Sequence, residues 1–344
     1  MAAPSADPPD GLLLAGDVGG TKTVLGIFSE DQGPGRPLAV KTYPSAAYPG
    51  LDAIASEFLA SVHLHVQRAC FDVAGPVADG RAKLTNLSWK PLREPALAEA
   101  LGLRSVRLLN DLEAIALGIT QLPSRDLRVL HRRKPASRGT IAVIAPGTGL
   151  GEAFLVWTGD RYSAYPSEGG HGDFAPGSQR EAELLSWLRQ RHGHVSWEQV
   201  CSGMGIPNLY QFLADTGSAA EPEQVASRIA TAPDRTRAIV EAGMDPGSGS
   251  ERCAEVLNLF AGILGAEVGN MALTVLATGG IYLAGGIPPA ILPVLRRGPF
   301  LRRVHDKGRL SPIVAAIRVS VVTGRAALIG AAAAGLGTRA EHQL

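Results

Sequence analysis

LLLAGDVGGTKTVLGIF, residues 12–28, reads as an apolar strand, a glycine-rich turn and a second apolar strand. The same order returns in IAVIAPGTGLGEAFLVW, residues 141–157. Because two copies of one hairpin stand far apart in the chain, we expect two related domains, each beginning with this hairpin. The chain has 344 residues, 45% of them hydrophobic, which is more than one core usually fills and agrees with two domains.

Strand-like and helix-like segments alternate along the chain, which predicts an α/β fold. Residues 69–74 and 106–109 are typical of buried strands, and the polar stretch 221–250 is typical of a peripheral helical insertion. Apolar residues three and four apart predict helices over 51–67, 111–119, 179–191 and 252–276, and the alanine-rich segment 326–336 is expected to be helical as well.

These elements predict a smaller domain over residues 11–120 and a larger domain over residues 121–321. The C-terminal segment 322–344 is expected to return to the smaller domain as a helix.

Charge and cysteine content exclude several classes of protein. Lys and Arg number 33 against 32 Asp and Glu, so no extended field is available to attract nucleic acid or an anionic membrane. Cys70, Cys201 and Cys253 are far apart and form no CxxC pair, which predicts neither disulfides nor a zinc cluster. We therefore expect a cytoplasmic protein.

Two segments bear on export and membrane insertion. Residues 1–11, MAAPSADPPDG, lack a basic and an apolar region, and predict a short disordered lead rather than a signal peptide. The uncharged run 268–295 is long enough to span a bilayer. Its glycine and proline pairs divide it into helix, turn, strand and loop, which favours a soluble protein.

The first hairpin turn, Asp17-Val-Gly-Gly-Thr-Lys22, offers backbone N–H groups unobstructed by Cβ atoms, together with a hydroxyl and an ammonium. Phosphate oxygens could bind there. The pattern is not a P-loop, because the glycine spacing differs and a strand follows. A tight hairpin that simply needs glycine remains an alternative. The turn Gly147-Thr148-Gly149 and the pair Gly285-Gly286 repeat the feature.

Asn110 and Asp111 follow a predicted strand and open a predicted helix. Glu113 is placed to form a capping box with Asn110, so the pair has a structural interpretation as well as a catalytic one. The local pattern leaves both open.

Glu168-Gly-Gly-His171 places a carboxylate and an imidazole on a glycine-flanked loop that could approach a polar ligand. Metal ligation is the alternative, but no second His or Cys cluster has zinc spacing. Glu198 is expected in the first turn of a helix capped by Ser196, where acidic residues are common for dipole reasons alone.

Seven motifs in order resemble the bacterial glucokinases, which belong to the hexokinase or actin-like ATPase superfamily. The resemblance covers about residues 12–335 and is to the type without a zinc-binding cysteine cluster. The motifs are DVGGTKT (17–23), LTNLSW (84–89), LLNDLEAIALG (108–118), APGTGLG (145–151), SEGGHGDFAP (167–176), HVSWEQVCSG (194–203) and YLAGGI (282–287).

The resemblance implies two actin-like (RNase H-like) domains with mixed sheets flanked by helices, and an active site in the cleft between them. It also implies transfer of the γ-phosphoryl group of Mg·ATP to the 6-hydroxyl of glucose. A homodimer is implied as well, and no zinc is expected.

The resemblance assigns roles to individual residues. Asp111 is the catalytic base, and Asp17 reaches Mg²⁺ through water. Pro146 stands where the family is expected to have a smaller residue. This difference affects the angle at which the chain enters the second hairpin. Sugar contacts fall to Asn110, Asp111, Glu168, His171, Glu198 and, near the sugar, Asn86, and ATP contacts to Asp17, Gly19, Gly20, Thr21, Gly147, Thr148, Gly149, Gly285 and Gly286.

Three alternatives of function remain. One is a kinase of another hexose, and a second is a polyphosphate-dependent glucokinase, since phosphate-binding turns do not by themselves read adenine. The third is a non-enzymatic sugar sensor such as a repressor. We do not expect it, because about eleven residues precede the first strand, too few for a helix-turn-helix.

Overall fold

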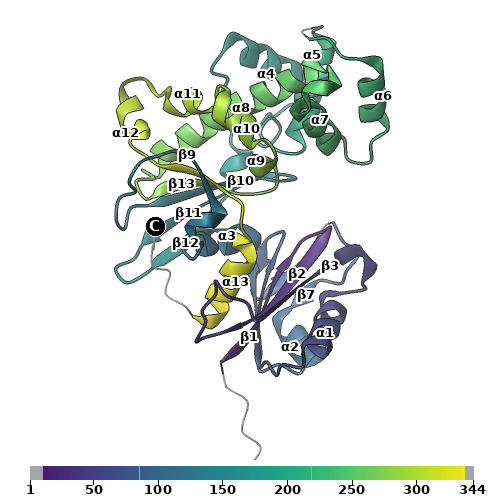
Figure 1. The fold of residues 1–344 in the computed structure, drawn as a ribbon, viewed down its shortest axis with the longest axis vertical. Coiled ribbons are helices and arrows are strands. Elements are labelled where there is room, and N and C mark those ends of the chain that lie inside the picture. Colours follow the sequence, from purple (N-terminus) through teal and green to yellow (C-terminus); the bar gives the residue numbers. More distant parts are fainter. Residues whose placement is uncertain (1–10, 85, 218, 338–344) are drawn as a thin grey trace, which may run out of the picture. The chain divides into compact units, whose positions relative to one another are not determined.

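The computed structural model describes residues 11–84, 86–217 and 219–337. The chain separates into two compact units (Figure 1). Unit 1 comprises Met1–Asp126, Leu155–Tyr165 and Gly324–Leu344, and unit 2 comprises Leu127–Phe154 and Pro166–Thr323. The disordered lead expected before the first strand lies outside the described residues, except for Gly11.

Unit 1 is built on a five-stranded mixed sheet in the order β3-β2-β1-β4-β8. Strands β1 (Leu12–Val18) and β2 (Lys22–Ser29) form the expected antiparallel hairpin, which β3 (Ala39–Pro44) extends. Strands β4 (Arg68–Val73) and β8 (Ser105–Asn110) run parallel to β1. Strands β1, β2 and β4 are almost continuously buried, as is typical of strands in a sheet that helices cover on both faces.

One face of this sheet packs on α1 (Leu51–Val62) and α2 (Glu94–Leu101). The other face packs on α3 (Asp111–Ile119) and α13 (Ala326–Leu336). The predicted helix over 51–67 is too long, because His63 adopts a left-handed conformation and ends α1 at Val62. A small sheet of β5 (Val77–Ala78), β6 (Arg81–Ala82) and β7 (Leu92–Arg93) completes the unit.

Helices α3 and α13 approach each other closely because both carry glycine at the contact. A Cβ atom on Gly118 would collide with the carbonyl oxygen of Ala326, and one on Gly330 would collide with that of Ala114. The C-terminal helix therefore packs within unit 1 by close backbone contact.

Unit 2 contains most of a six-stranded sheet in the order β12-β11-β10-β13-β14-β9. Strands β10, β13 and β14 are parallel, and β9 is antiparallel to β14. The strand bounds are β9 Leu127–His131, β10 Ile141–Pro146, β11 Leu150–Trp157, β12 Tyr162–Ser167, β13 Gly280–Leu283 and β14 Val319–Val322.

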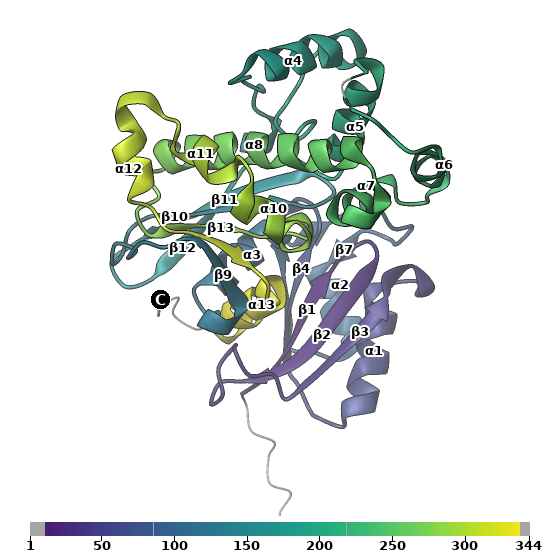
Figure 2. The same ribbon diagram turned by 45° about the horizontal axis from the view of Figure 1, so that its top comes forward.

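The core of unit 2 forms around α8 (Glu251–Thr274), a long helix that crosses the sheet in Figure 2. Helices α5 (Gly205–Asp215), α7 (Arg235–Met244) and α11 (Phe300–His305) pack against it. The remaining helices are α4 (Gln179–His192), α6 (Glu223–Thr231), α9 (Ile287–Ala290), α10 (Leu292–Arg297) and α12 (Ser311–Ala315). Short 3-10 turns occur at Ser45–Ala47, Ser124–Asp126, Gly169–His171, Pro246–Ser248 and Gly308–Leu310.

The stretch 221–250 is helical as expected, but it is not peripheral. Ile239 and Val240 of α7 and Ile229 of α6 enter the core of unit 2. Burial of these residues in the core outweighs the polar composition of the stretch.

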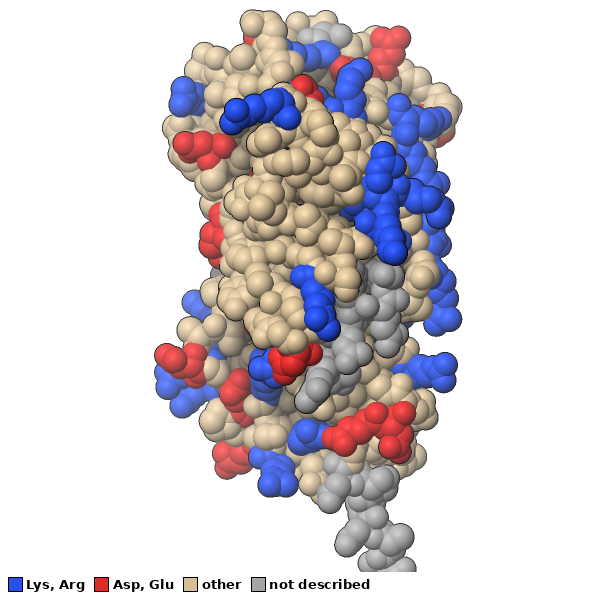
Figure 3. Space-filling model, turned by 90° about the vertical axis from the view of Figure 1, so that its left-hand side faces the viewer, with Lys and Arg blue, Asp and Glu red and all other residues tan. Residues whose placement is uncertain are grey.

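Within the described part of the chain, α8 is the one helix long and apolar enough to cross a membrane. Its most apolar window is 78% buried inside the protein, which is typical of a core helix. The uncharged run 268–295 is divided as expected, because α8 ends at Thr274 and β13 follows from Gly280. Figure 3 shows charged groups of both signs on one face, in keeping with the balanced charge of the sequence.

Candidate active site

The turn between β1 and β2 is fixed by hydrogen bonds. The Gly19 N–H donates to the Lys22 carbonyl (3.0 Å), and the Ser45 hydroxyl donates to the Gly19 carbonyl (2.7 Å). A Cβ atom on Gly20 would lie 3.0 Å from Cβ of Asn86, so Asn86 packs directly on the turn. Sequence analysis did not single out Ser45, which carries no motif of its own.

Three acidic side chains gather where β1, β4 and β8 end. Asp17 of β1 and Asp72 of β4 are register partners, and Asp111 begins α3 directly after β8. Asp72 is completely buried, and neither of its carboxyl oxygens has a hydrogen-bond partner among the described residues. Burial raises the pKa of Asp72 well above its ordinary value, and the charges of Asp17 and Asp111 raise it further. Sequence analysis missed Asp72, although a carboxylate within the apolar strand RACFDV was a usable signal.

Burial also raises the pKa of Asp17, while the charges of Lys22 and Arg325 oppose that rise. The pKa of Asp111 is raised to about 6, mainly by burial and further by Asp17, although the Leu112 N–H stabilises the carboxylate. A carboxylate with this pKa is ionised at neutral pH and is a stronger base than an ordinary aspartate.

Asn110 caps α3, which is one of the two interpretations that the sequence left open. Its side-chain oxygen accepts from the N–H groups of Leu112 (2.9 Å) and Glu113 (3.4 Å), and its amide donates to the Gly75 carbonyl (2.9 Å). The Glu113 carboxylate lies 3.6 Å from Arg107. The cap holds Asn110 and Asp111 in fixed positions at the positive end of the helix dipole.

The second glycine-rich turn, between β10 and β11, is held by the segment after Glu198. The Gly203 N–H donates to the Gly147 carbonyl (2.8 Å), and the Met204 N–H donates to the Thr148 carbonyl (3.2 Å). The Leu150 N–H donates to Oε2 of Glu198 (2.8 Å).

His171 lies between two carboxylates in unit 2. Its Nδ1 is 3.6 Å from Oε2 of Glu168, and its Nε2 is 3.6 Å from Oε1 of Glu198. The Glu198 N–H donates to the Gly170 carbonyl (2.8 Å), which ties the two segments together. The side chains of Glu168 and His171 are 93% and 62% exposed, so both can meet a ligand from solvent.

The prediction of a helix that begins around Glu198 is wrong. Residues 197–204 form hydrogen-bonded turns, and α5 begins at Gly205. The Ser202 hydroxyl donates to the Glu198 carbonyl (2.6 Å) and accepts from the Gly205 N–H (3.2 Å), so it ends the turns and begins the helix. Glu198 therefore owes its position to these turns and not to a cap by Ser196.

Gly285 and Gly286 follow β13, whose parallel partner is β10. Gly285 has φ +78°, and a Cβ atom there would lie 2.5 Å from the Pro146 carbonyl oxygen. Strand β10 runs through Pro146, and the turn at Gly147 closes with a bond from its N–H to the Gly149 carbonyl (2.9 Å). Two of the glycine motifs thus lie together at the carboxyl ends of neighbouring strands.

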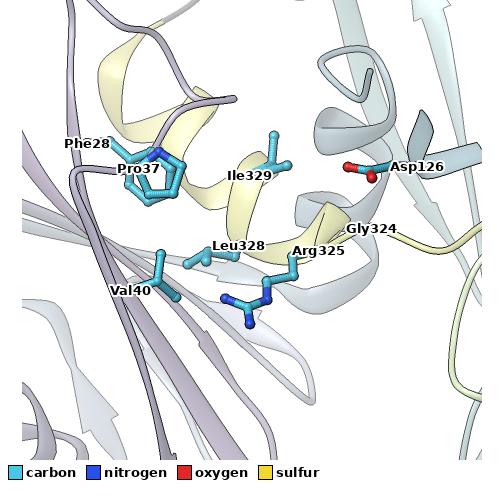
Figure 4. Close-up of a pocket in the computed structure, with 8 residues that line it drawn as sticks. All are labelled: Phe28, Pro37, Val40, Asp126, Gly324, Arg325, Leu328 and Ile329. Carbon is cyan, nitrogen blue, oxygen red and sulfur yellow. The ribbon is translucent and has the colours of Figure 1, made fainter. Parts of the chain in front are cut away.

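A pocket of about 250 Å³ in unit 1 lies apart from these residues (Figure 4). Phe28, Pro37 and Val40 face Leu328 and Ile329 of α13 across it. None of the predicted site residues lines this pocket. Arg325 does line it, and the charge of Arg325 also acts to lower the pKa of Asp17.

Comparison with known proteins shows the family, because a protein-family model described as Glucokinase matches residues 14–337. The chain belongs to the glucokinase family. A glucokinase of Nostoc sp. (strain PCC 7120) is 41% identical over 336 residues, covering 93% of this chain and 98% of the relative. A glucokinase of Synechocystis sp. is 39% identical, covering 93% and 96%.

Solved structures agree with this family assignment. The glucokinase from an Antarctic psychrotroph matches with a TM-score of 0.80 and 32% identity, covering 95% of this chain and 99% of that one. The glucokinase from Balamuthia mandrillaris, solved with glucose, shares the fold with a TM-score of 0.75 at 19% identity, covering 94% and 93%. The expected resemblance and the two-domain α/β fold are thereby confirmed, and the protein is an ATP-dependent sugar kinase.

Proposed function

We propose that this protein transfers the γ-phosphoryl group of Mg·ATP to the 6-hydroxyl of glucose, giving glucose 6-phosphate and ADP. The observation that carries the sugar site is the position of His171, 3.6 Å from the carboxylates of both Glu168 and Glu198. A hexose is a ring of hydroxyls, and carboxylate and imidazole groups bond such hydroxyls as acceptors and donors.

Asp111 is the proposed base. It accepts the proton of the 6-hydroxyl as the oxygen attacks the γ-phosphorus, and its pKa of about 6 suits this role at neutral pH. Asn110 holds the start of α3 and is proposed to hydrogen-bond the sugar as well. Asn86, which packs on the turn at Gly20, is proposed to lie near the sugar.

The proposed ATP site uses backbone groups of three glycine-rich turns. Their N–H groups and lack of side chains suit phosphate oxygens and a close approach to the nucleotide. Phosphoryl transfer asks little covalent chemistry of the protein, so positioning and charge neutralisation carry it. The residues are Gly19, Gly20, Thr21, Gly147, Thr148, Gly149, Gly285 and Gly286.

Mg²⁺ fits the donor set near the first turn. The half-buried Asp17 carboxylate is a hard oxygen donor, and Mg²⁺ prefers such donors while keeping several waters. When bound, Mg²⁺ neutralises charge on the phosphates of ATP. Asp17 is proposed to hold it through water.

The test is direct measurement of sugar 6-phosphate. Purified protein is offered ATP or polyphosphate with glucose, mannose, fructose and galactose. Rapid product with ATP and glucose, and little with the other hexoses, is expected. Faster turnover with polyphosphate would instead indicate a polyphosphate-dependent glucokinase. Equal turnover of several hexoses would indicate a kinase that is not specific for glucose.

Two further properties accompany this function. A homodimer is proposed from the family resemblance, and light scattering that gives the mass of one chain would contradict it. A cytoplasmic location is proposed from the reduced, separate cysteines, each of which is buried.

A further inference from the structure

A buried carboxyl pair lies beneath the loop that carries His171. Glu152 is the third residue of β11, and Glu267 belongs to α8, with exposed fractions of 3% and 6%. Their carboxyl groups face each other, and each affects the pKa of the other. Two buried carboxylates so close cannot both be ionised at low cost, so sharing one proton is favoured.

Glu152 also touches the loop itself. A Cβ atom on Gly169 would collide with Oε2 of Glu152, and one on Gly170 would collide with the Leu150 carbonyl. Strand β11 therefore lies directly under the Gly169-Gly170 turn. The next residue along the chain is His171, so Glu152 supports the backbone from which that side chain projects.

Glu267 connects the pair to the surface of unit 2. One of its oxygens accepts from the Asn270 amide (2.9 Å), and the Asn270 oxygen accepts from Lys307 Nζ (2.7 Å). Lys307 also donates to the Ala266 carbonyl (2.9 Å). Gly269 allows this approach, because a Cβ atom there would collide with the Lys307 side chain.

We propose that Glu152 and Glu267 are positioning residues, whose shared proton keeps Glu152 against Gly169 and thereby sets the affinity of the His171 loop for glucose. This inference rests on the proposed function, since it names what controls the sugar site. Nothing in the reaction itself requires either carboxyl, which makes the role separable from catalysis.

The charges around the pair give the expected pH dependence. Burial raises the pKa of Glu152, and it raises that of Glu267 to about 8, with the Glu152 charge adding to the rise. Buried Cys201 faces both carboxyls, and Lys307 faces Glu267 with Arg303 and Asp306 beside it. When the shared proton leaves above about pH 8, two negative charges repel each other under the loop.

The experiment measures glucose binding by calorimetry, without ATP, from about pH 7 to about pH 9. Wild-type affinity is expected to fall by about tenfold over this range, as when one buried hydrogen bond is lost. Glu267→Gln should keep the affinity at neutral pH and flatten the pH profile, because its amide still donates to Glu152 at every pH. Glu152→Gln should behave likewise, with its amide donating to Glu267.

Glu152→Ala removes the support altogether and should raise the glucose KM about tenfold while the ATP KM stays nearly unchanged. Glu181→Gln is the matched control, because Glu181 is a buried carboxylate of unit 2 that pairs with Arg303 (3.0 Å) instead. It should leave the pH dependence of glucose binding as in wild type.

Two results would overturn the inference alone: Glu267→Gln with the wild-type pH profile, or folded Glu152→Ala with unchanged glucose affinity. Thermal unfolding checks that Glu152→Ala is folded. If it is not, the pH profile of Glu267→Gln alone tests the inference. A wild-type protein that neither binds glucose nor forms sugar phosphate would overturn the proposed function, and this inference with it.

Discussion

Asp17 and Asp72 occupy the same register on the neighbouring parallel strands β1 and β4, and Asp72 is completely buried. Two carboxylates so placed cannot both be ionised at low cost, because the sheet interior has a low dielectric constant. Lys22 and Arg325 favour the charged form of Asp17, and the electrostatic effects at Asp72 are dominated by burial. Of the two carboxyls, Asp72 is therefore the one whose neutral form is more strongly favoured.

Replacing Asp72 tests this assignment through stability. Its pKa is raised above the unfolded value, so its contribution to stability is greatest at low pH and is lost as the pH rises toward the folded pKa. Asp72→Asn has the same shape and no charge. It should raise the free energy of unfolding by about 1–2 kcal/mol near pH 8 and by less near pH 5, measured with urea. A gain independent of pH would contradict the assignment.

Asp111→Asn should lower turnover by roughly 10²- to 10⁴-fold while glucose binding persists, because the amide cannot accept the hydroxyl proton. For the wild type, kcat/KM should fall below about pH 6, where Asp111 becomes protonated and can no longer act as a base. Glu113→Gln, two residues along the same helix, is the control and should retain both properties. Turnover of Asp111→Asn within a few-fold of wild type would remove the catalytic role.

Glu168→Gln and His171→Ala should weaken glucose binding far more than ATP binding, since both side chains project from the loop assigned to the sugar. Calorimetry with each ligand measures the two losses separately. Asp173→Asn is the control from the same loop, because its carboxylate pairs with His194 (2.7 Å). Equal losses for glucose and ATP would indicate a structural loop instead.

Chelation should stop activity, and Mg²⁺ alone should restore it, because charge on the transferred phosphates must be neutralised. The assay compares EDTA-treated protein before and after addition of Mg²⁺ or Zn²⁺. Zinc in stoichiometric amount in the purified protein would contradict our interpretation of Cys70, Cys201 and Cys253.

Gly330→Ala should destabilise unit 1 by about 1–3 kcal/mol, because its Cβ would collide with the backbone of α3. Helix propensity alone predicts the opposite, because replacing glycine with alanine within a helix raises the free energy of unfolding by about 1 kcal/mol. The sign of the change in chemical denaturation separates the two effects. A stabilised variant would show that α3 and α13 can move apart at little cost.

Much of the fold followed from the sequence because its signals are local. Strand, glycine turn and strand in residues 12–28 and 141–157 predicted both hairpins, and helices from Asp111 and Ala326 began where their patterns predicted. The sugar residues and ATP turns came from the motifs and their resemblance to a family. Their roles remain predictions, although Glu168, His171 and Glu198 do come together within unit 2.

Tertiary structure alone decided the features that depend on distant segments. Asp72 meets Asp17 through strand register, and Glu152 meets Glu267 because α8 packs against the sheet that contains β11. Neither pair is marked by a characteristic spacing in the sequence. The helix start expected from a cap at Ser196 was also wrong, because residues 197–204 form hydrogen-bonded turns and α5 begins only at Gly205. Periodicity reports which face of an element is apolar, whereas register and packing decide which buried polar groups meet, and those contacts set their charge.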